Sequence, residues 1–214
     1  ESAKEALQVA DRRMYTQKNQ RADSALSQTR GVLLGMLRER EPELDRHLGG
    51  VAQLAGAMGR ELGLDAEDMD VLVRAAEMHD IGKIAIPDEI LRKTTSLSEA
   101  EEALLQGHTV VAERILAAAP ALRQVARLVR FSRESWDGSG YHDGLAGEEI
   151  PLGSRVIQIC DEYISMTEGK PHGAPMSGPE AAAELRRSAG SQLDPRLVEL
   201  FIGKVISASP AGRL

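Results

Sequence analysis

The sequence predicts an all-α protein, a helical bundle preceded by an N-terminal linker helix, on three observations. Aromatic residues make up only 3% of the 214 residues, and runs of β-branched residues are scarce. Ala, Leu, Glu and Arg, which are good helix formers, dominate the chain. Apolar residues also recur every three or four positions, which is the spacing of an amphipathic helix, as in Leu44, Leu48, Val51, Leu54, Ala55 and Met58.

The individual helices follow from this spacing and from the positions of Gly and Pro. The stretch "AKEALQVADRRMYTQKNQR" is predicted to form the first helix, and residues 23–40 the second. Pro42 suits the first turn of a third helix, which is predicted to end at Leu62 before Gly63. The later helices are expected at 66–80, 98–118, 121–132, 153–168, 178–189 and 194–206. The Gly- and Pro-rich segments 81–97 and 133–152 are expected to be loops.

Composition and charge narrow the classes of partner. The formal net charge of -7 argues against binding to a nucleic acid polymer. No apolar run is long enough to span a membrane, so no membrane partner is expected for this segment. Cys160 is the only cysteine, which excludes an internal disulfide and favours a cytoplasmic location. Because the first residue is not Met, we expect the sequence to be part of a longer protein.

Several potential metal ligands lie at helix ends or on apolar helix faces. In "AAEMHDIGK", His79 and Asp80 are adjacent at the end of a predicted helix, which frees both side chains to turn toward one point. Imidazole nitrogen and carboxylate oxygen are ligands for divalent transition metals. A polar His-Asp pair without a metal is the alternative interpretation.

Three further residues have the same two interpretations. His47 follows Glu43 by one helical turn, so the two side chains share a face, as a ligand pair or as a solvated polar pair. Asp161 shares an apolar face with Ile157 and Ile164, where an unpartnered carboxylate would be costly. A metal ion, a backbone group or an Arg could each offset that cost. His108 also lies on an apolar helix face, as a ligand or as a packed core residue.

Taken together, these residues and the motifs around them resemble the HD superfamily of metal-dependent phosphohydrolases. Residues 43–203 are more specifically similar to an HD-GYP domain, the bacterial cyclic di-GMP phosphodiesterase type. The matching segments are "HDIGKIAIPDEILRK", "LSEAEEALLQGH", "WDGSGYHDGLAGEEIPLGSRV", "CDEY" and "LDPRLVELF". The resemblance implies an all-helical bundle that holds metal ions between its helices and uses them to hydrolyse a phosphodiester.

The resemblance also implies roles for individual residues. The ligands of the first metal would be His47, His79, Asp80 and Asp161. Asp80 would bridge to a second metal held by His108, and Glu43 would serve a third metal. Asp80 and Lys83 would be the catalytic residues, and the nucleotide contacts would be Lys83, Arg133, Tyr141 and Lys170. The expected cofactor is iron or manganese, with nickel and zinc as alternatives, at one or two ions per chain.

The sequence departs from the family pattern at the second metal site. Two adjacent histidines normally precede the "E-x-WDGSGY" segment, and here those positions are Ser132 and Arg133. Ser is a poor ligand, and Arg carries a permanent positive charge without a lone pair to donate. The proline of the GYP signature is also replaced, by His142. His142 and His172 are the candidates to replace the two missing histidines of the second metal site. We expect Trp136 to fill the core rather than to act in catalysis.

The N-terminal segment carries a second, shorter resemblance. The stretch "ADRRMYTQK" is similar to the last helix of a GGDEF domain, which implies such a domain upstream in the full-length protein. Residues 1–40 would then be its tail and a signalling linker helix, and residues 41–214 the HD-GYP-like domain. The apolar residues of the linker permit a homodimer through a coiled coil.

Two functional hypotheses remain at this point. The first is a phosphodiesterase for cyclic di-GMP or a related cyclic dinucleotide, with weak activity because the second metal site is incomplete. The second is a catalytically inactive module that binds the nucleotide or acts in regulation or dimerisation in bacterial signalling.

Overall fold

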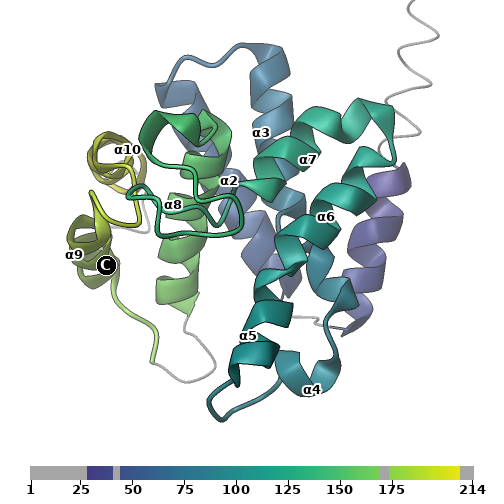
Figure 1. Cartoon of the computed structure of the whole chain (residues 1–214). Helices are drawn as coiled ribbons and strands as arrows, with labels where there is room; N and C mark the ends of the chain where they lie inside the picture. The colour runs from purple at the N-terminus through teal and green to yellow at the C-terminus, as the bar shows by residue number, and fades with distance from the viewer. Residues whose placement is uncertain (1–27, 41–43, 169–173, 208–214) are drawn as a thin grey trace, which may run out of the picture.

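The computed structural model describes residues 28–40, 44–168 and 174–207, and it confirms the predicted all-α fold. Within these ranges the backbone forms helices and no strand, apart from an isolated bridge between Ala189 and Leu193. Figure 1 shows the helices gathered around α2 and α8. None of the described helices combines the length and the hydropathy that a membrane span requires.

The first two helices of the bundle form a hairpin. Helix α2 spans Leu44–Glu61 and packs against α3, Ala66–Met78. Gly63, at φ 69°, makes the turn after α2 as predicted, because this left-handed conformation favours glycine. The Asp65 side chain caps α3 by accepting hydrogen bonds from the Glu67 and Asp68 amides. The helix ends at Met78, two residues before the predicted end, so Asp80 is the N-cap residue of the 3₁₀ turn η1, Ile81–Ala85.

The next segment differs most from the prediction. The expected loop at 81–97 contains η1 and the short helix α4, Asp88–Leu91. The prediction of a single helix at 98–118 was wrong. The segment forms two helices, α5, Glu99–Gln106, and α6, His108–Ala117. Gly107 lies at the break, in keeping with the low helix propensity of glycine. The division makes His108 the first residue of α6.

The close contact between η1 and α6 depends on a glycine. A Cβ atom on Gly82 would lie only 1.8 Å from the His108 carbonyl oxygen. Any other residue would therefore push α6 away from the turn that follows His79 and Asp80. After α6, the chain continues through η2, Pro120–Leu122, into α7, Arg123–Arg130, which packs on α6 and α3.

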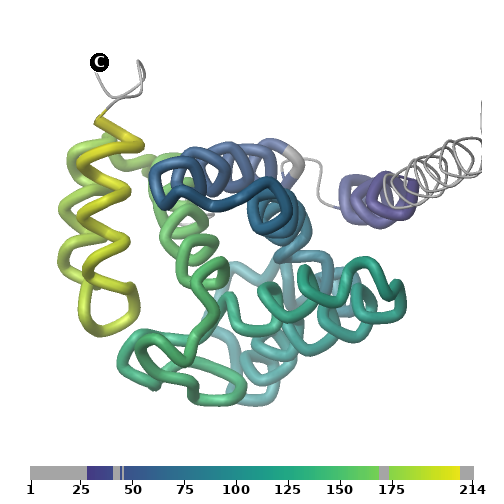
Figure 2. The backbone as a smooth tube through the Cα atoms, turned by 90° about the horizontal axis from the view of Figure 1, so that it is seen from above, coloured from purple at the N-terminus to yellow at the C-terminus, as the bar shows by residue number. Residues whose placement is uncertain are grey.

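The C-terminal half begins with the long loop at 131–151, which includes the 3₁₀ turn η3, Gly147–Glu149. Helix α8, Leu152–Glu168, packs against α2. Helices α9, Gly178–Ser188, and α10, Pro195–Leu200, cover α8, and α10 continues into the π-helical segment η4, Phe201–Ile206. Figure 2 shows this C-terminal group at one side of the molecule and the purple helix at 28–40 on the opposite side.

The described part of the N-terminal linker is helical over 28–40. Leu34 and Leu37 are buried as part of the same core as α2 and α3. Arg30 pairs with Glu77 of α3 at 2.8 Å. Arg40 donates hydrogen bonds to the Ile84 and Ile86 carbonyl oxygens, at 2.5 and 2.8 Å, in the segment that follows the His-Asp pair.

Candidate metal centre

The His79-Asp80 pair lies at the centre of the bundle, where α3 gives way to η1. Both residues are only 1% exposed. The Nδ1 atom of His79 donates to the Ala76 carbonyl oxygen at 2.8 Å, because a carbonyl can only accept. In the neutral imidazole this hydrogen bond leaves a lone pair on Nε2, which lies 3.6 Å from Asp80 Oδ2. The end of the helix therefore presents a nitrogen and a carboxylate to one point.

Two other helices bring His47 and Asp161 to the same point. His47 comes from α2 and Asp161 from α8, 114 positions apart in the sequence. His47 Nε2 lies 2.7 Å from Asp161 Oδ1, and His79 Nε2 lies 3.4 Å from the same oxygen. One ligand atom each from His47, His79 and Asp80 lie within 4.8 Å of one another. This spacing, with Asp161 in contact with both imidazoles, is compact enough for one metal ion.

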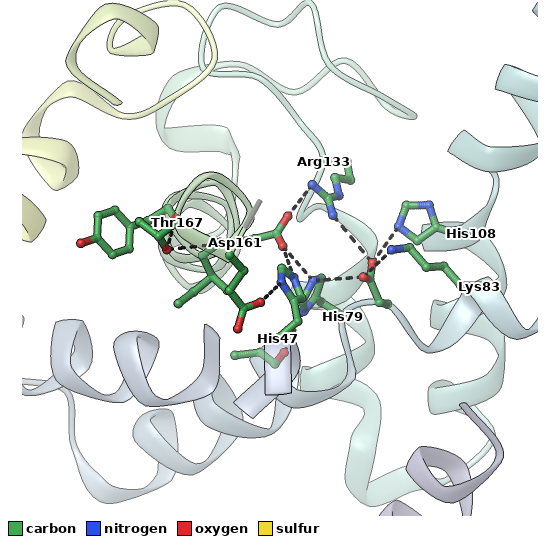
Figure 3. A network of polar contacts seen from close by, with 12 residues as sticks. His47, His79, Lys83, His108, Arg133, Asp161 and Thr167 are labelled. Atoms are coloured by element: carbon green, nitrogen blue, oxygen red, sulfur yellow. Dashed lines mark hydrogen bonds and ion pairs between the residues drawn. The ribbon is translucent and has the colours of Figure 1, made fainter. Parts of the chain in front are cut away.

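His108 and Lys83 contact the other side of the Asp80 carboxylate. His108 Nδ1 donates to the Leu105 carbonyl oxygen at 2.7 Å, and its Nε2 lies 3.6 Å from Asp80 Oδ1. The Lys83 ammonium lies 2.7 Å from Asp80 Oδ2. We use the name metal cluster for His47, His79, Asp80, His108 and Asp161. Figure 3 shows that Lys83 and Arg133 point toward this cluster.

Arg133 enters the cluster from the loop after α7. Its Nη1 atom lies 2.7 Å from Asp161 Oδ2, and its Nη2 atom lies 3.7 Å from Asp80 Oδ1. The neighbouring Ser132 is buried, and its hydroxyl donates to the Val129 carbonyl oxygen at 2.9 Å. Where two imidazoles were expected at positions 132 and 133, the structure therefore has one guanidinium in contact with the two carboxylates.

The charges in the cluster shift the protonation of its members. Burial opposes ionisation of Asp80, but Lys83, His79 and Arg133 hold the pKa of that carboxyl below its usual range. Burial also opposes ionisation of Asp161, whose pKa stays well below the usual range because of Arg133 and the two imidazoles. Both carboxylates are thus ionised at neutral pH and available to a cation.

The two inner histidines respond in opposite directions. Burial lowers the pKa of His108 to about 4, so its ring is neutral at pH 7. Burial alone would lower the pKa of His79 as well, but Asp80 and Asp161 raise it above the ordinary value. A metal ion at this point would displace the His79 proton, because only the neutral imidazole is a ligand.

Three polar atoms of the cluster have no hydrogen-bond partner. Among the described residues, the buried side-chain atoms without one are His79 Nε2, Asp80 Oδ1, His108 Nε2 and Thr109 Oγ1. Leaving a buried polar group unpaired costs about 1–3 kcal/mol. Three such atoms around one carboxylate suit a site that binds an ion.

The loop after Arg133 is held by a second polar group, which sequence reasoning missed. Glu134 is fully buried and accepts hydrogen bonds from the Asp143 and Leu145 amides, at 2.8 and 3.1 Å. Trp136 was expected to fill the core, but it is only half-buried. The guanidinium of Arg155 lies over its ring, 5.7 Å from the centroid, and pairs with Asp194 at 2.7 Å. We use the name loop anchor for Glu134, Trp136, Arg155 and Asp194.

A neighbour of His47 was also missed. Glu168 Oε2 lies 3.5 Å from His47 Nδ1, on the ring edge opposite Asp161. The helical period offered a signal, since Glu168 follows Asp161 by seven residues and so shares its face of α8.

The remaining predicted residues are placed as follows. Tyr141 is half-buried and burial raises its pKa, with Arg133 and Asp80 among the charges that act on it. His142 Nε2 donates to the Gln106 carbonyl oxygen at 2.6 Å, so the structure engages it outside the metal cluster. Glu43, Lys170 and His172 lie outside the described residues.

Comparison with known proteins gives matches over most of the chain. Residues 31–197 match the family model described as HD domain. A cyclic di-GMP phosphodiesterase of Thermotoga maritima is 35% identical over 173 residues, which are 79% of this chain and 47% of that protein. A 3'3'-cGAMP-specific phosphodiesterase 2 of Vibrio cholerae is 32% identical over 79% of this chain and 33% of its own length.

A solved structure shares the fold. Bd1817, described as a HDG"Y"P protein from Bdellovibrio bacteriovorus, aligns with a TM-score of 0.61 at 17% identity, over 74% of this chain and 51% of that one. This chain spans about half the length of the first curated relatives that it matches.

Proposed function

The chain belongs to the HD domain family, and from that premise we propose that it is a metal-dependent phosphodiesterase domain of the HD-GYP type. Its substrate would be cyclic di-GMP or a related cyclic dinucleotide, which are the substrates in the names of its relatives. Because the second metal site lacks two ligands, the proposed activity is weak.

The observation that carries the proposal is the metal cluster itself. Two imidazoles and two ionised carboxylates from three separate helices meet in the core, and two of their atoms, His79 Nε2 and Asp80 Oδ1, lack hydrogen bonds. In a purely structural cluster, these unpaired buried atoms would lower the stability of the fold with nothing to offset the loss. This donor set fits a divalent transition metal, held by His47, His79, Asp80 and Asp161, and iron or manganese is the expected ion. Such an ion would activate water and neutralise charge on a phosphate oxygen.

The cationic residues of the site suit an anionic substrate. Lys83 holds Asp80 with one donor and has two others for a phosphate oxygen. The Arg133 guanidinium carries five N–H donors, more than its contacts with Asp161 and Asp80 use. The Tyr141 phenol is near enough to Lys83 and Arg133 for both positive charges to act on it. In this proposal, Asp80 positions the metal, while Lys83, Arg133 and Tyr141 bind the phosphodiester, together with Lys170.

A second candidate function is favoured by one observation, the ion pairs that Arg133 makes with both carboxylates. These ion pairs neutralise part of the negative charge of Asp80 and Asp161, which a second metal ion would otherwise balance. A module with this site would bind the nucleotide without hydrolysing it.

Further parts of the proposal concern the longer protein. A GGDEF-like domain would precede the linker at 1–40, and residues 41–214 would form the catalytic domain. A homodimer through the linker is supported by Val32 and Met36, which are 64% and 52% exposed. A cytoplasmic location completes the proposal, and Glu43 would be the ligand of a third metal where one binds.

The test combines metal content with turnover. The purified domain is loaded with Mn²⁺ or, without oxygen, with Fe²⁺, and incubated with cyclic di-GMP and with 3'3'-cGAMP. We expect bound metal and slow formation of linear product, both lost in Asp80→Asn. Binding of the nucleotide without product would favour the second function, and the absence of both metal and nucleotide binding would refute the proposal.

A further inference from the structure

Arg133 brings a permanent positive charge into contact with both carboxylates of the site. Its Nη1 lies 2.7 Å from Asp161 Oδ2 and its Nη2 lies 3.7 Å from Asp80 Oδ1. The side chain is 21% exposed, whereas those of Asp161 and Asp80 are 5% and 1% exposed. The guanidinium thus lies between two buried anions (Figure 3), and its side chain keeps part of its surface accessible to solvent.

A second metal ion has too few ligands beside Asp80. Of the residues expected to hold a second metal, the His108 imidazole, 3.6 Å from Asp80 Oδ1, is the remaining ligand beside that bridging carboxylate. Ser132 does not replace the missing imidazole, because its hydroxyl is hydrogen-bonded to the Val129 carbonyl oxygen within the end of α7. A transition-metal site in a protein normally needs at least three protein ligands.

The electrostatic surroundings also disfavour a second ion. Lys83 lies 2.7 Å from one oxygen of Asp80, and Arg133 lies near the other. Both side chains are charged at neutral pH, and Arg cannot give up its proton. An incoming divalent cation would face two fixed positive charges at close range, in a buried site where screening is weak.

We infer that the site binds a single divalent metal, at His47, His79, Asp80 and Asp161, and that the Arg133 guanidinium supplies the positive charge a second metal would bring. This inference rests on the proposed function for its substrate, since the charge is of use to a phosphodiester. The guanidinium is fixed in place by the carboxylates and keeps free N–H donors for a phosphate oxygen.

The inference predicts effects of opposite sign in Arg133→Met. Loss of the positive charge strengthens the attraction of both carboxylates for a cation, so Mn²⁺ binds about tenfold more tightly. The same loss removes the phosphate contact, so inorganic phosphate binds the Mn²⁺-loaded domain about tenfold more weakly. General damage to the site would instead weaken the binding of both.

The experiment begins with titration of the metal-free domain with Mn²⁺ by calorimetry. We expect one ion per chain in the wild type and two in the double variant Ser132→His with Arg133→His, because that change restores two imidazoles beside His108. Phosphate binding to the loaded domain is followed by phosphorus NMR relaxation, which bound Mn²⁺ enhances. Circular dichroism checks that each variant is folded. If the Met or His variants do not fold, Arg133→Lys is used instead, and because it keeps the positive charge we expect it to bind one ion.

Arg130→Met is the matched control. Arg130 lies three residues earlier, is similarly buried, and pairs with Asp143 and Glu113 rather than with the metal cluster. Its loss should leave both the number of ions and their affinity unchanged.

Two results would overturn the inference. One is a wild-type domain that binds two Mn²⁺ ions with similar affinity, which would leave the proposed phosphodiesterase intact. The other is an Arg133→Met variant in which Mn²⁺ and phosphate both bind more weakly. A wild-type domain that binds no Mn²⁺ at all would refute the proposed function together with the inference.

Discussion

Residues 133 and 134 are neighbours in the chain, yet their side chains enter two buried polar groups of different kinds. Arg133 enters the metal cluster, where three buried atoms lack hydrogen bonds. Glu134 belongs to the loop anchor, where its two carboxylate oxygens each accept an amide hydrogen. Both groups are charged and removed from water, so burial and charge alone do not distinguish a binding site from a structural support.

The difference lies in how completely each group is paired. In the loop anchor, Arg155 donates to the Ile150 carbonyl oxygen and to Asp194, and it covers the ring of Trp136. Asp194 in turn accepts from the first amides of α10. The metal cluster has more charge but fewer hydrogen bonds, which is what a site requires if a ligand completes it. The following predictions test whether this distinction holds, from the largest expected effect to the smallest.

The largest effect is expected in the loop anchor. Arg155→Met removes the partner of the buried Asp194 carboxylate and should lower the free energy of unfolding by about 3 kcal/mol. Urea denaturation of the metal-free domain measures it. The control is Arg186→Met, whose partner Glu199 is on the surface, with side chains 51% and 60% exposed. That surface pair should contribute less than about 1 kcal/mol. Equal losses in the two variants would show that the anchor is not a structural support.

The metal cluster should gain its stability from the ion rather than from its own contacts. At a Mn²⁺ concentration a hundredfold above Kd, the free energy of unfolding should rise by about 2.7 kcal/mol. Asp80→Asn should abolish this gain, because the amide is a weak ligand. Asp143→Asn, which alters a carboxylate paired with Arg130 outside the cluster, should keep it. Thermal unfolding with Mn²⁺ and with a chelator measures both, and an equal gain in Asp80→Asn would place the ion elsewhere.

The fold and the metal cluster were largely predictable from the sequence, because their signals are local and chemical. Periodicity gave most helices to within two or three residues, and the resemblance to the HD superfamily is confirmed by the family match. The His79-Asp80 pair alone is a weak signal, because polar pairs are common at helix ends, and it was the resemblance to the HD superfamily that grouped it with His47, His108 and Asp161. That these residues bind metal remains a prediction.

The errors arise where the answer depends on contacts far apart in the sequence. Gly107 divides the predicted helix at 98–118, and the adjoining η1 can approach α6 only because residue 82 is Gly. Trp136 looked like a core residue because of its size, but Arg155, nineteen positions away, covers its face. Nothing local in the sequence reveals that pairing.

A smaller effect should separate the neighbours 133 and 134 directly. Glu134→Gln replaces one acceptor by an amide nitrogen that cannot accept from an N–H, so the free energy of unfolding should fall by about 2 kcal/mol. Mn²⁺ affinity should stay within about twofold of the wild type, since Glu134 contacts loop amides rather than the metal cluster. Urea denaturation and calorimetry on the same variant measure the two quantities. A large fall in Mn²⁺ affinity would mean that the two groups act as one.

The smallest effect concerns the edge of the metal cluster, where Glu168 lies 3.5 Å from His47 Nδ1. If His47 gives Nε2 to a metal, its proton is on Nδ1, and a carboxylate there holds the ring in the orientation that ligation needs. Glu168→Gln should therefore weaken Mn²⁺ binding by about tenfold, which is about 1.4 kcal/mol, with little change in the metal-free stability. Glu184→Gln, a surface carboxylate paired with Arg187 on α9, is the control and should not alter the affinity. The Glu168 side chain is 29% exposed, so its loss should cost the fold little. A loss confined to metal affinity would then mean that this carboxylate serves the ion rather than the fold. Unchanged affinity would restrict the metal site to the buried residues alone.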